Sequence, residues 1–465
     1  MAEVVIVSAA RTPIGTLNGS LSSVTAVELG TIAAKAAIRR SGISASDIGQ
    51  SIFGNVLQAN NGQNIARQIA LRAGMDTSST AMTVNEVCGS GLKAVRMGQA
   101  AILLGDADTV LVGGTESMSN TPYYATDMRS GHKYGSVEFV DGIFRDGLSD
   151  AFTGQPMGMT AENVAKTFGI TRRQQDEFAL KSHIKAVNAQ LSGAFDEEIA
   201  PVPVPAGHTG GHSILVDKDD GPRDDTDMEK LGRLRTVFVK PDCAAAGCGS
   251  SGCGELGHGK NGRGEPGRRE AGRGDSGFPD NSGTAQDTDT LQNTDTVDPP
   301  DAAQVRGTVT AGNASGINDG AAALVLMRKD LAIERGISYL AEISGYAEGG
   351  IDPDFMGYAP KRVIERMLRN THSAIEDIDL FEINEAFASQ SIAVMDQLEI
   401  PENKLNVNGG AIALGHPLGA SGARILVTLL YALRARKKST GVAALCVGGG
   451  IGVAMQVRMA DGTDR

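Results

Sequence analysis

Two cysteines and one histidine stand in turns that are unusually rich in glycine. Cys88 lies within Asn85–Leu92, His416 lies within Asn406–Gly422, and Cys446 is followed closely by Gly448–Gly450. Glycine allows a backbone to approach a substrate closely, and a helix that begins beyond such a turn directs its free N–H groups and positive dipole end into it. We therefore expect each turn to present a thiol or an imidazole to a small substrate.

Cys88 is the candidate nucleophile. It follows an apolar strand and opens a helix, so the helix dipole predicts a thiolate whose pKa lies below the ordinary value of about 8.5. The alternative is a buried cysteine that serves only as a small apolar side chain. The open backbone of Gly89–Gly91 favours the nucleophile, because a packing position has no need of it.

A thiol nucleophile needs a base, and His416 can accept its proton. Cys446 provides a second thiol that can move a proton, and the N–H groups of its neighbours can hold a developing oxyanion. Asn384 ends the predicted strand Leu380–Ile383 and can orient a water molecule or donate to a carbonyl oxygen. Capping of the next helix is an equally good interpretation of Asn384.

The elements around these turns suggest an internal duplication. Residues 83–114 predict a strand, the Cys88 turn, a helix from about Leu92 to Leu104 and a strand at Thr109–Val112. Residues 405–450 predict the same order, with the His416 turn, an amphipathic helix and a strand at Val442–Leu445. Such alternation indicates two α/β halves with buried sheets, and packing the halves together would bring both sets of turns to one site.

The residues between the halves have a different character. Thr171 and Gln174 form a predicted capping box at the start of a helix, within an excursion over residues 118–240 that we expect to cover the site. Residues 241–300 hold 13 glycines and few large apolar side chains, which predicts disorder over residues 241–305. Four possible zinc ligands occur there at intervals of five, but without the usual C-x-x-C pairs we predict no metal site; they are Cys243, Cys248, Cys253 and His258.

Composition limits the class of protein. The chain has 465 residues, 41% of them hydrophobic, which is enough for two or three domains with sizeable cores. A net charge of −12 argues against a general nucleic-acid binder. The five cysteines form no disulfide framework, the start Met1–Ser8 is typical of a buried strand, and no uninterrupted apolar stretch is long enough to span a bilayer. We expect a cytoplasmic protein.

Three blocks taken together resemble the thiolase family: Asn85–Gly91, Asn384–Ala388, and the Gly409–Gly422 turn with Cys446–Gly450 after it. The resemblance covers residues 1–240 and 306–458 and implies a duplicated αβαβα layered fold with a loop domain over the active site. The implied domains are an N-terminal half at 1–117, completed by about 318–338, a loop domain at 118–317 that includes the insert, and a C-terminal half at 339–465.

The resemblance also implies the chemistry. Cys88 would carry an acyl group, His416 would accept its proton, and Cys446 would exchange a proton with the carbon of a second acetyl-CoA. One oxyanion pocket would use His416 and a water on Asn384, and the other the backbone N–H groups of Cys88 and Gly448. No cofactor or metal is implied, and related proteins pair through their sheets, so a homodimer or homotetramer is expected.

Substrate contacts are carried over in the same way. Ser315, in the turn Thr310–Gly316, would contact the pantetheine arm of coenzyme A, and Arg223 would lie near its nucleotide end; an ordinary turn serine and a solvated arginine are the alternatives. The acyl contacts implied are Leu148, Met157, Ala386 and Phe387. Short-chain thiolases often carry a histidine where this chain has Pro156, which leaves the acyl length open.

The sequence therefore predicts an acetyl-CoA C-acetyltransferase that interconverts acetoacetyl-CoA and CoA with two molecules of acetyl-CoA. A 3-ketoacyl-CoA thiolase that prefers longer chains is the alternative among enzymes. A decarboxylating ketoacyl synthase fits less well, because such sites pair the cysteine with two histidines. From another class, a non-catalytic CoA-binding scaffold remains an alternative because of the insert, which is either a looped-out segment or an error in the gene sequence.

Overall fold

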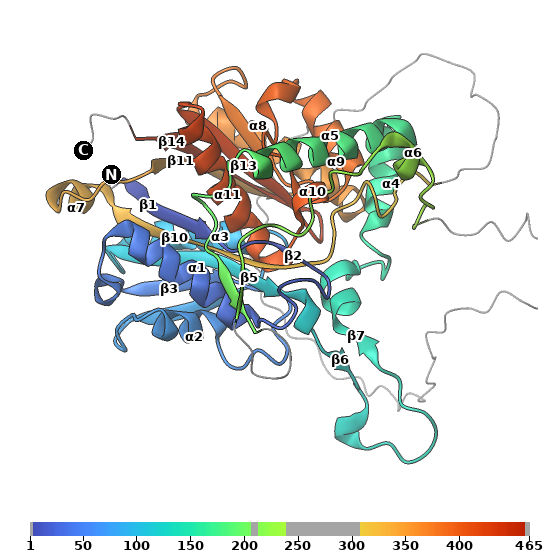
Figure 1. Cartoon of the computed structure of the whole chain (residues 1–465), viewed down its shortest axis with the longest axis horizontal. Helices are drawn as coiled ribbons and strands as arrows, with labels where there is room; N and C mark the ends of the chain where they lie inside the picture. Colours follow the sequence, from blue (N-terminus) through green and yellow to red (C-terminus); the bar gives the residue numbers. More distant parts are fainter. Residues whose placement is uncertain (1–2, 206–212, 239–306, 461–465) are drawn as a thin grey trace, which may run out of the picture. The chain divides into compact units, whose positions relative to one another are not determined.

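The computed structural model describes residues 3–205, 213–238 and 307–460 (Figure 1). The predicted disorder of residues 241–305 and the four cysteine and histidine residues there lie outside the described residues. Most described strands follow one hydrogen-bonded path, β12-β13-β14-β11-β1-β10-β5-β3-β4, with the two-residue β2 (Gly15–Thr16) beside β10.

The N-terminal half contributes the second part of this path. Strand β3 lies parallel to both β4 and β5, β5 is antiparallel to β10, and β10 is antiparallel to β1. The strands are β1 (Val4–Arg11), β3 (Gln50–Gly54), β4 (Thr80–Val84), β5 (Thr109–Ser117) and β10 (Asn318–Arg328).

The C-terminal half repeats the same pattern of directions. Strand β12 is parallel to β13 and makes a parallel bridge from Phe381 to Leu405; β13 is antiparallel to β14, and β14 is antiparallel to β11. The strands are β11 (Ala341–Gly350), β12 (Leu380–Ile383), β13 (Thr440–Val447) and β14 (Ile451–Met459). The repeated pairing confirms the duplication, and β1 meets β11 through Val5 and Ile6.

Helices form three layers around the two halves of the sheet. Helices α3 (Ser90–Leu104) and α11 (Leu418–Ala435) pack together in the central core. One outer layer is formed by α1 (Ala26–Ser41) and α2 (Ile65–Arg72), and the other by α8 (Ala359–Thr371) and α9 (Ala388–Gln397), as Figure 1 shows. This order of layers confirms the predicted αβαβα fold.

Helix α11 is long and apolar enough to cross a membrane by length and composition. It nevertheless carries Arg424 and Arg434, and 83% of its 18-residue apolar window is buried inside the protein. Its hydrophobicity is explained by its position between the two halves, where apolar side chains on every face find protein neighbours.

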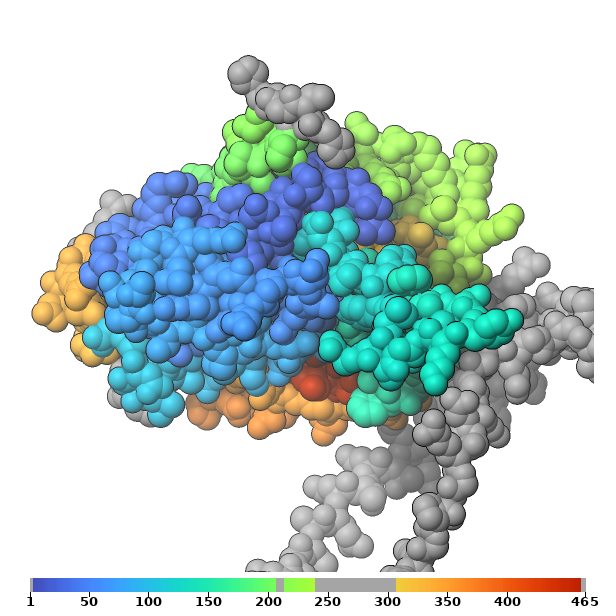
Figure 2. Space-filling view, turned by 90° about the horizontal axis from the view of Figure 1, so that it is seen from below, coloured from blue at the N-terminus to red at the C-terminus, as the bar shows by residue number. Residues whose placement is uncertain are grey.

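Residues 118–205 and 213–238 form a set of elements beside the halves, and the longest of these is the 20-residue helix α5. The hairpin β6–β7 and the neighbouring turns, coloured teal, lie next to the blue N-terminal half in Figure 2. The capping box predicted at Thr171 is present at the start of α5. The elements are η2 (Met118–Asn120), β6 (Tyr123–Tyr124), η3 (Met128–Ser130), β7 (Val140–Asp141), η4 (Phe144–Leu148), α4 (Gly158–Thr167), α5 (Arg172–Leu191), β8 (Val202–Val204), β9 (Ile214–Val216) and α6 (Met228–Gly232).

The strand predicted just before the His416 turn is wrong. After η6 (Glu402–Lys404), Leu405 makes a single bridge, and the chain then turns into the four-residue helix α10 (Ala411–Leu414). Asn406 has a left-handed backbone with φ 43° and uses its side chain where a strand would use its main chain. Its Oδ1 accepts from Ile383 N at 2.8 Å and its Nδ2 donates to Ile383 O at 2.9 Å. One side chain therefore provides hydrogen-bond partners for both backbone groups at the end of β12.

Two predicted boundaries also differ. Helix α3 begins at Ser90 rather than near Leu92, and β5 continues to Ser117 rather than ending near Val112. The extension of β5 matters because it brings Glu116 into the central layer. The remaining short elements are η1 (Ala45–Asp47), α7 (Lys329–Glu334) and η5 (Pro353–Tyr358).

Candidate active site

The Cys88 turn joins β4 to α3 through a strained residue. Val87 has φ 46°, a left-handed conformation that is costly for a β-branched side chain. Asn85 Oδ1 accepts from Val87 N at 2.9 Å, and Ser90 Oγ donates to the Val87 carbonyl at 2.6 Å. These side chains hold a sharp bend that places Cys88 directly before the first turn of α3.

Cys88 is buried, and two backbone N–H groups face its sulfur. The N–H groups of Gly448 and of Cys88 itself approach Sγ and lower its pKa, but burial dominates and raises the pKa to about 12. The expected lowering of the Cys88 pKa is therefore wrong. Desolvation of the charged form outweighs the dipole and the two N–H groups, so Cys88 rests as a neutral thiol.

Cys446 lies at the end of β13, beside the turn that contains Gly448. A Cβ atom on Gly448 would lie 2.5 Å from Cε of Met157 and 3.2 Å from Cγ1 of Val87, so this turn lies in close contact with the Cys88 turn and a side chain here would displace Met157. Burial raises the pKa of the Cys446 thiol, and the charge of a Cys88 thiolate raises it further. The two sulfurs are thus electrostatic neighbours in a buried space.

His416 follows α10 and directly precedes Pro417, the N-cap of α11. Its backbone N–H donates to Asn318 Oδ1 at 2.9 Å. Ser421 Oγ donates its single hydrogen to the Pro417 carbonyl and lies 2.5 Å from His416 Nδ1, so Nδ1 carries the proton and donates to Oγ. The lone pair is left on Nε2. Burial and then the positive Arg424 lower the pKa of His416 to about 3, so the imidazole is a neutral acceptor.

Asn384 comes directly after β12 and faces the histidine. Its Nδ2 lies 3.5 Å from His416 Nε2, while its buried Oδ1 has no hydrogen-bond partner among the described residues. Helix α9 has Phe387 as its N-cap, without a side-chain bond, so the capping alternative for Asn384 is wrong. An unpartnered buried amide oxygen is a suitable anchor for a water molecule.

Two glycines, one in α3 and one in α11, allow close backbone contacts that bring these turns together. A Cβ on Gly91 of α3 would lie 2.6 Å from the backbone nitrogen of Ala423 in α11, and Gly422 of α11 meets the backbone of Leu92 equally closely. The helices that follow Cys88 and His416 therefore cross with their backbones in contact. In the other half, Asn384 N donates to Ala444 O at 2.9 Å, which sets Asn384 beside the strand that ends at Cys446.

An apolar cluster surrounds Cys446. Ala386 and Met356 are buried against it, and Met157 and Phe387 pack onto the same cluster. Leu148 lies next to Met157, because its carbonyl accepts the Met157 N–H at 3.0 Å. The predicted acyl contacts Leu148, Met157, Ala386 and Phe387 therefore lie in one neighbourhood.

Sequence reasoning missed two members of this neighbourhood. Met356 belongs to the buried cluster, and the ring of Phe238 stands 6.4 Å from that of Phe387 in an edge-to-face arrangement. Phe238 also covers Gly158 at the start of α4. Met356 lies in no motif, and although Phe238 ends the family-like run Leu234–Phe238, its contact with Phe387 depends on the tertiary fold.

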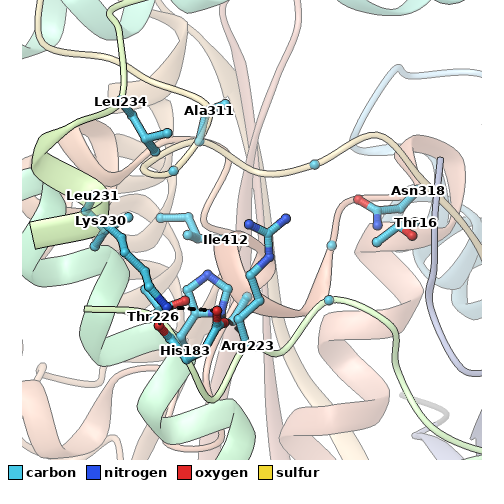
Figure 3. Close-up of a pocket in the computed structure, with 17 residues that line it drawn as sticks. Thr16, His183, Arg223, Thr226, Lys230, Leu231, Leu234, Ala311, Asn318 and Ile412 are labelled. Atoms are coloured by element: carbon cyan, nitrogen blue, oxygen red, sulfur yellow. Dashed lines mark hydrogen bonds and ion pairs between the residues drawn. The ribbon is translucent and has the colours of Figure 1, made fainter. Parts of the chain in front are cut away.

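A separate cavity of about 200 Å³ lies beside α5, α6 and α10 (Figure 3). Arg223 extends its guanidinium into this space, with Leu231 and Leu234 on one side and Asn318 on the other. Ser315 does not line the cavity itself, although its neighbours Ala314 and Gly316 do. No sequence pattern pointed to His183, Thr226 and Lys230, which also line it.

The described residues contain no group of three or more His, Cys, Asp or Glu side chains that could hold a metal ion. The zinc alternative concerned Cys243, Cys248, Cys253 and His258, all outside the described residues.

Comparison with known proteins identifies the class. The family model of the thiolase N-terminal domain matches residues 4–251 and 280–330, and that of the thiolase C-terminal domain matches residues 337–459. The chain belongs to the thiolase family and is an acyltransferase. The resemblance found in the sequence is thereby confirmed.

Among the similar proteins, a probable acetyl-CoA acyltransferase of Staphylococcus aureus is 42% identical over 457 residues, which cover 98% of this chain and 99% of the relative. The structure of the Bacillus anthracis acetyl-CoA acetyltransferase matches with a TM-score of 0.83 and 36% identity over 99% of both chains. Human mitochondrial 3-ketoacyl-CoA thiolase matches with a TM-score of 0.82 and 35% identity, also over 99% of both chains.

Proposed function

We propose that this protein is an acetyl-CoA C-acetyltransferase that works through an acetyl group on Cys88. The observation that carries the proposal is the setting of the Cys88 sulfur, which faces two backbone N–H groups and has Cys446 as its neighbour. His416 and Asn384 supply an imidazole lone pair and an unpartnered amide oxygen, and α11, which follows His416, crosses α3, which follows Cys88.

In the first half-reaction, Cys88 Sγ attacks the thioester carbonyl of acetyl-CoA. The Sγ–H proton passes to His416 Nε2 as the sulfur–carbon bond forms, because a neutral thiol with a high pKa needs a base at the moment of attack. The N–H groups of Cys88 and Gly448 stabilise the carbonyl oxygen as it becomes negative. The CoA sulfur leaves and takes the proton of Cys446, which becomes a thiolate.

In the second half-reaction, Cys446 removes a proton from the methyl group of another acetyl-CoA. The enolate oxygen is stabilised by His416, now protonated, and by a water held on Asn384. The enolate carbon attacks the acetyl group on Cys88, the sulfur leaves, and it recovers its proton from His416. The products are acetoacetyl-CoA and CoA, and every proton is accounted for.

Cleavage of acetoacetyl-CoA runs through the same steps in reverse. Burial raises the pKa values of both thiols, so the resting state has both cysteines protonated. A protonated Cys446 is ready to return a proton to the departing enolate of acetyl-CoA.

Coenzyme A would occupy the cavity beside α5, α6 and α10. Arg223 and Lys230 are cationic side chains that line it. Lys230 pairs with Asp225 of the same lining at 2.9 Å, so Arg223 is the side chain whose charge best suits the phosphates of the nucleotide. The carbonyl groups of the Thr310–Gly316 turn would meet the pantetheine amides. Ser315 stays a predicted contact through its position between two lining residues.

A short acyl group is favoured by the size of the side chains around Cys446. Met157, Met356 and Phe387 are large and pack on the same cluster, and we expect such side chains to limit the length of an acyl group there. The rival with a longer acyl chain is supported by the similarity to human mitochondrial 3-ketoacyl-CoA thiolase and by Pro156. Comparing kcat/KM for four-carbon and longer 3-ketoacyl-CoA substrates distinguishes them.

The decisive experiment is mass spectrometry of the intact protein after incubation with acetyl-CoA. We expect a mass gain of one acetyl group that disappears in Cys88→Ala and persists in Cys446→Ala, the matched control. Binding of CoA without any mass gain would instead support a non-catalytic scaffold.

Two further predictions accompany the proposal. Relatives of this fold pair through their sheets, so we expect a homodimer or homotetramer, which size-exclusion chromatography with light scattering measures. A cytoplasmic location also stays a prediction, to be checked by fractionation of the source cell.

A further inference from the structure

A buried carboxylate lies between the Cys88 half and the His416 helix. Glu116 belongs to β5, where Thr115 and Ser117 bond to carbonyl groups of the α1 segment on one face. Because side chains alternate along a strand, Glu116 points to the opposite face, into the central layer of α3 and α11. Its exposed fraction is 0%.

Four N–H groups converge on this carboxylate. Oε1 accepts from Asn55 Nδ2 at 2.8 Å and from Leu57 N at 3.1 Å. Oε2 accepts from Val56 N at 3.0 Å and from Gly419 N at 2.8 Å. Burial raises the pKa of Glu116 to about 7, while the N–H groups of Gly419, Val56 and Leu57 lower it. An ionised carboxylate only accepts hydrogen bonds, and because each oxygen here accepts two N–H groups, the contacts favour the ionised form.

Gly419 is the partner with a mechanistic consequence. It is the second residue of α11, where backbone N–H groups have no partner within the helix, and Pro417 provides no side-chain cap. Glu116 therefore caps α11 from another strand, and its charge suits the positive end of the helix dipole.

The imidazole of His416 is attached to that same helix end. Its Nδ1 bonds to Ser421 Oγ in the first turns of α11, and its backbone lies three residues before Gly419. The position of His416 relative to Cys88 thus depends on what ties the start of α11 to the N-terminal half. Asn318 Oδ1, from β10, makes the second such tie to the His416 N–H.

Glu116 is also close enough to the nucleophile for its charge to raise the pKa of Cys88. It thus acts on Cys88 through its charge and on His416 through the Gly419 N–H of α11, and no hydrogen bond joins it to the reacting atom of either residue in the described structure.

We propose that Glu116 is a positioning residue that holds the His416 imidazole at the distance and orientation from Cys88 that proton transfer requires. The inference rests on the proposed function, in which His416 takes the Cys88 proton. A misplacement of about 1 Å in such a pair can cost about 100-fold in rate.

The test uses Glu116→Gln, which keeps the volume of the side chain. Glutamine offers one acceptor oxygen and one NH2 group, so either orientation sets that NH2 against two N–H donors. Glu198→Gln is the matched control, because Glu198 is also 0% exposed and pairs with Arg11 and Thr428 instead.

Single-turnover acetylation of Cys88 is measured by mass over a range of acetyl-CoA concentrations. For Glu116→Gln we expect the saturating rate to fall about 10- to 100-fold, with the half-saturating concentration changed less than about threefold. Glu198→Gln should acetylate within about threefold of the unmodified protein. An unchanged rate in Glu116→Gln, or an equal loss in both variants, overturns the proposal.

A second readout does not depend on the substrate. Alkylation of Cys88 by iodoacetamide at pH 7 should slow in Glu116→Gln toward the rate of His416→Ala, and not in Glu198→Gln. If the unmodified protein fails to acetylate, the proposed function fails, and alkylation alone then decides whether Glu116 positions the pair.

Should Glu116→Gln not fold, Glu116→Asp takes its place in both assays. Its carboxylate keeps the acceptor character and is one methylene short of Gly419, so we again expect slower acetylation and alkylation than in Glu198→Gln. Rates equal to those of the unmodified protein would overturn the proposal.

Discussion

At the scale of residues, the site consists of neutral groups. Burial raises the pKa of Cys88 to about 12 and lowers that of His416 to about 3, so neither carries a charge near pH 7. Charge appears only when the proton moves between them. The surrounding N–H groups and the amide of Asn384 are therefore fixed before any charge develops, which is the condition for electrostatic stabilisation of a transition state.

The two proton tasks should separate in variants. His416→Ala removes the acceptor for the Cys88 proton, and we expect acetylation of Cys88 to slow about 100- to 10,000-fold. Cys446→Ala leaves that acceptor in place and removes only the proton donor for the departing CoA sulfur, so acetylation should continue at a lower rate while carbon–carbon bond formation is lost. Mass spectrometry measures the first step and acetoacetyl-CoA formation the second; equal loss of both steps in both variants would refute the separate roles.

The pH dependence of Cys88 alkylation checks the resting state. The His416 pKa is lowered, so its base form is present at every pH above about 3, and the Cys88 thiol keeps its proton up to about pH 12. Between pH 6 and 9 the proton goes to His416 and the rate should be nearly flat. In His416→Ala only the free thiolate reacts, and the rate should rise about tenfold per pH unit.

Iodoacetamide does not ionise in this range, so its reaction rate reports the cysteine. A sigmoidal rise with a midpoint below about pH 8.5 in the unmodified protein would instead show the acidic thiol that the helix position predicts. The sequence identifies the thiol and its helix, but the pKa depends on burial by segments that are hundreds of residues away. For this reason the direction of the shift could not be obtained from the turn alone.

At the scale of elements, backbone contact between α3 and α11 sets the geometry. Gly91 has no room for a Cβ, whereas a Cβ on Gly232 in α6 would have no neighbouring atom within 4 Å. We expect Gly91→Ala to lower the free energy of unfolding by about 1–3 kcal/mol and to slow acetylation, because the helices must move apart. Gly232→Ala should be neutral or slightly stabilising. Denaturant unfolding and acetylation rates check both; similar behaviour of the two variants would contradict the role of this crossing.

Local signals predicted most elements correctly. The capping box at Thr171 and the strand Leu380–Ile383 each depend on neighbours in sequence, and both are present. The prediction of a strand before His416 is wrong because the side chain of Asn406, rather than a strand backbone, bonds to the N–H and carbonyl groups of Ile383. No sequence pattern shows that an asparagine side chain will take over the hydrogen bonds of a strand, since its partner Ile383 lies 23 residues away.

At the scale of the whole molecule, duplication explains why the site forms at all. Matching strand orders in the two halves place β4 and Leu405 at equivalent edges, and the chain after each turns toward the centre. The Cys88 and His416 turns thus arise from the same position of a repeated unit. The sequence predicted this arrangement from its order of strands and helices, while the residues that join the halves, Glu116 and Asn318, carry no motif.

The last prediction concerns the segment that lies outside the described residues. Its two flanks are held side by side, because Val237 N donates to Val309 O at 3.0 Å and Thr236 bridges Thr310 in antiparallel fashion. Two chains paired in this way can be joined by a short turn. We expect replacement of residues 240–305 by a short Gly-Ser turn to leave the fold and Cys88 acetylation intact.

The same replacement should raise stability. The entropic cost of closing a loop falls with each halving of its length. For about four halvings, this cost falls by about 2 kcal/mol. Denaturant unfolding of the shortened and full chains measures the difference, and acetylation at equal protein concentration measures function. Loss of folding or acetylation in the shortened chain would mean that residues 240–305 are needed by the acyltransferase itself. The pairing of Val237 with Val309 would then not be enough to hold the two flanks in place.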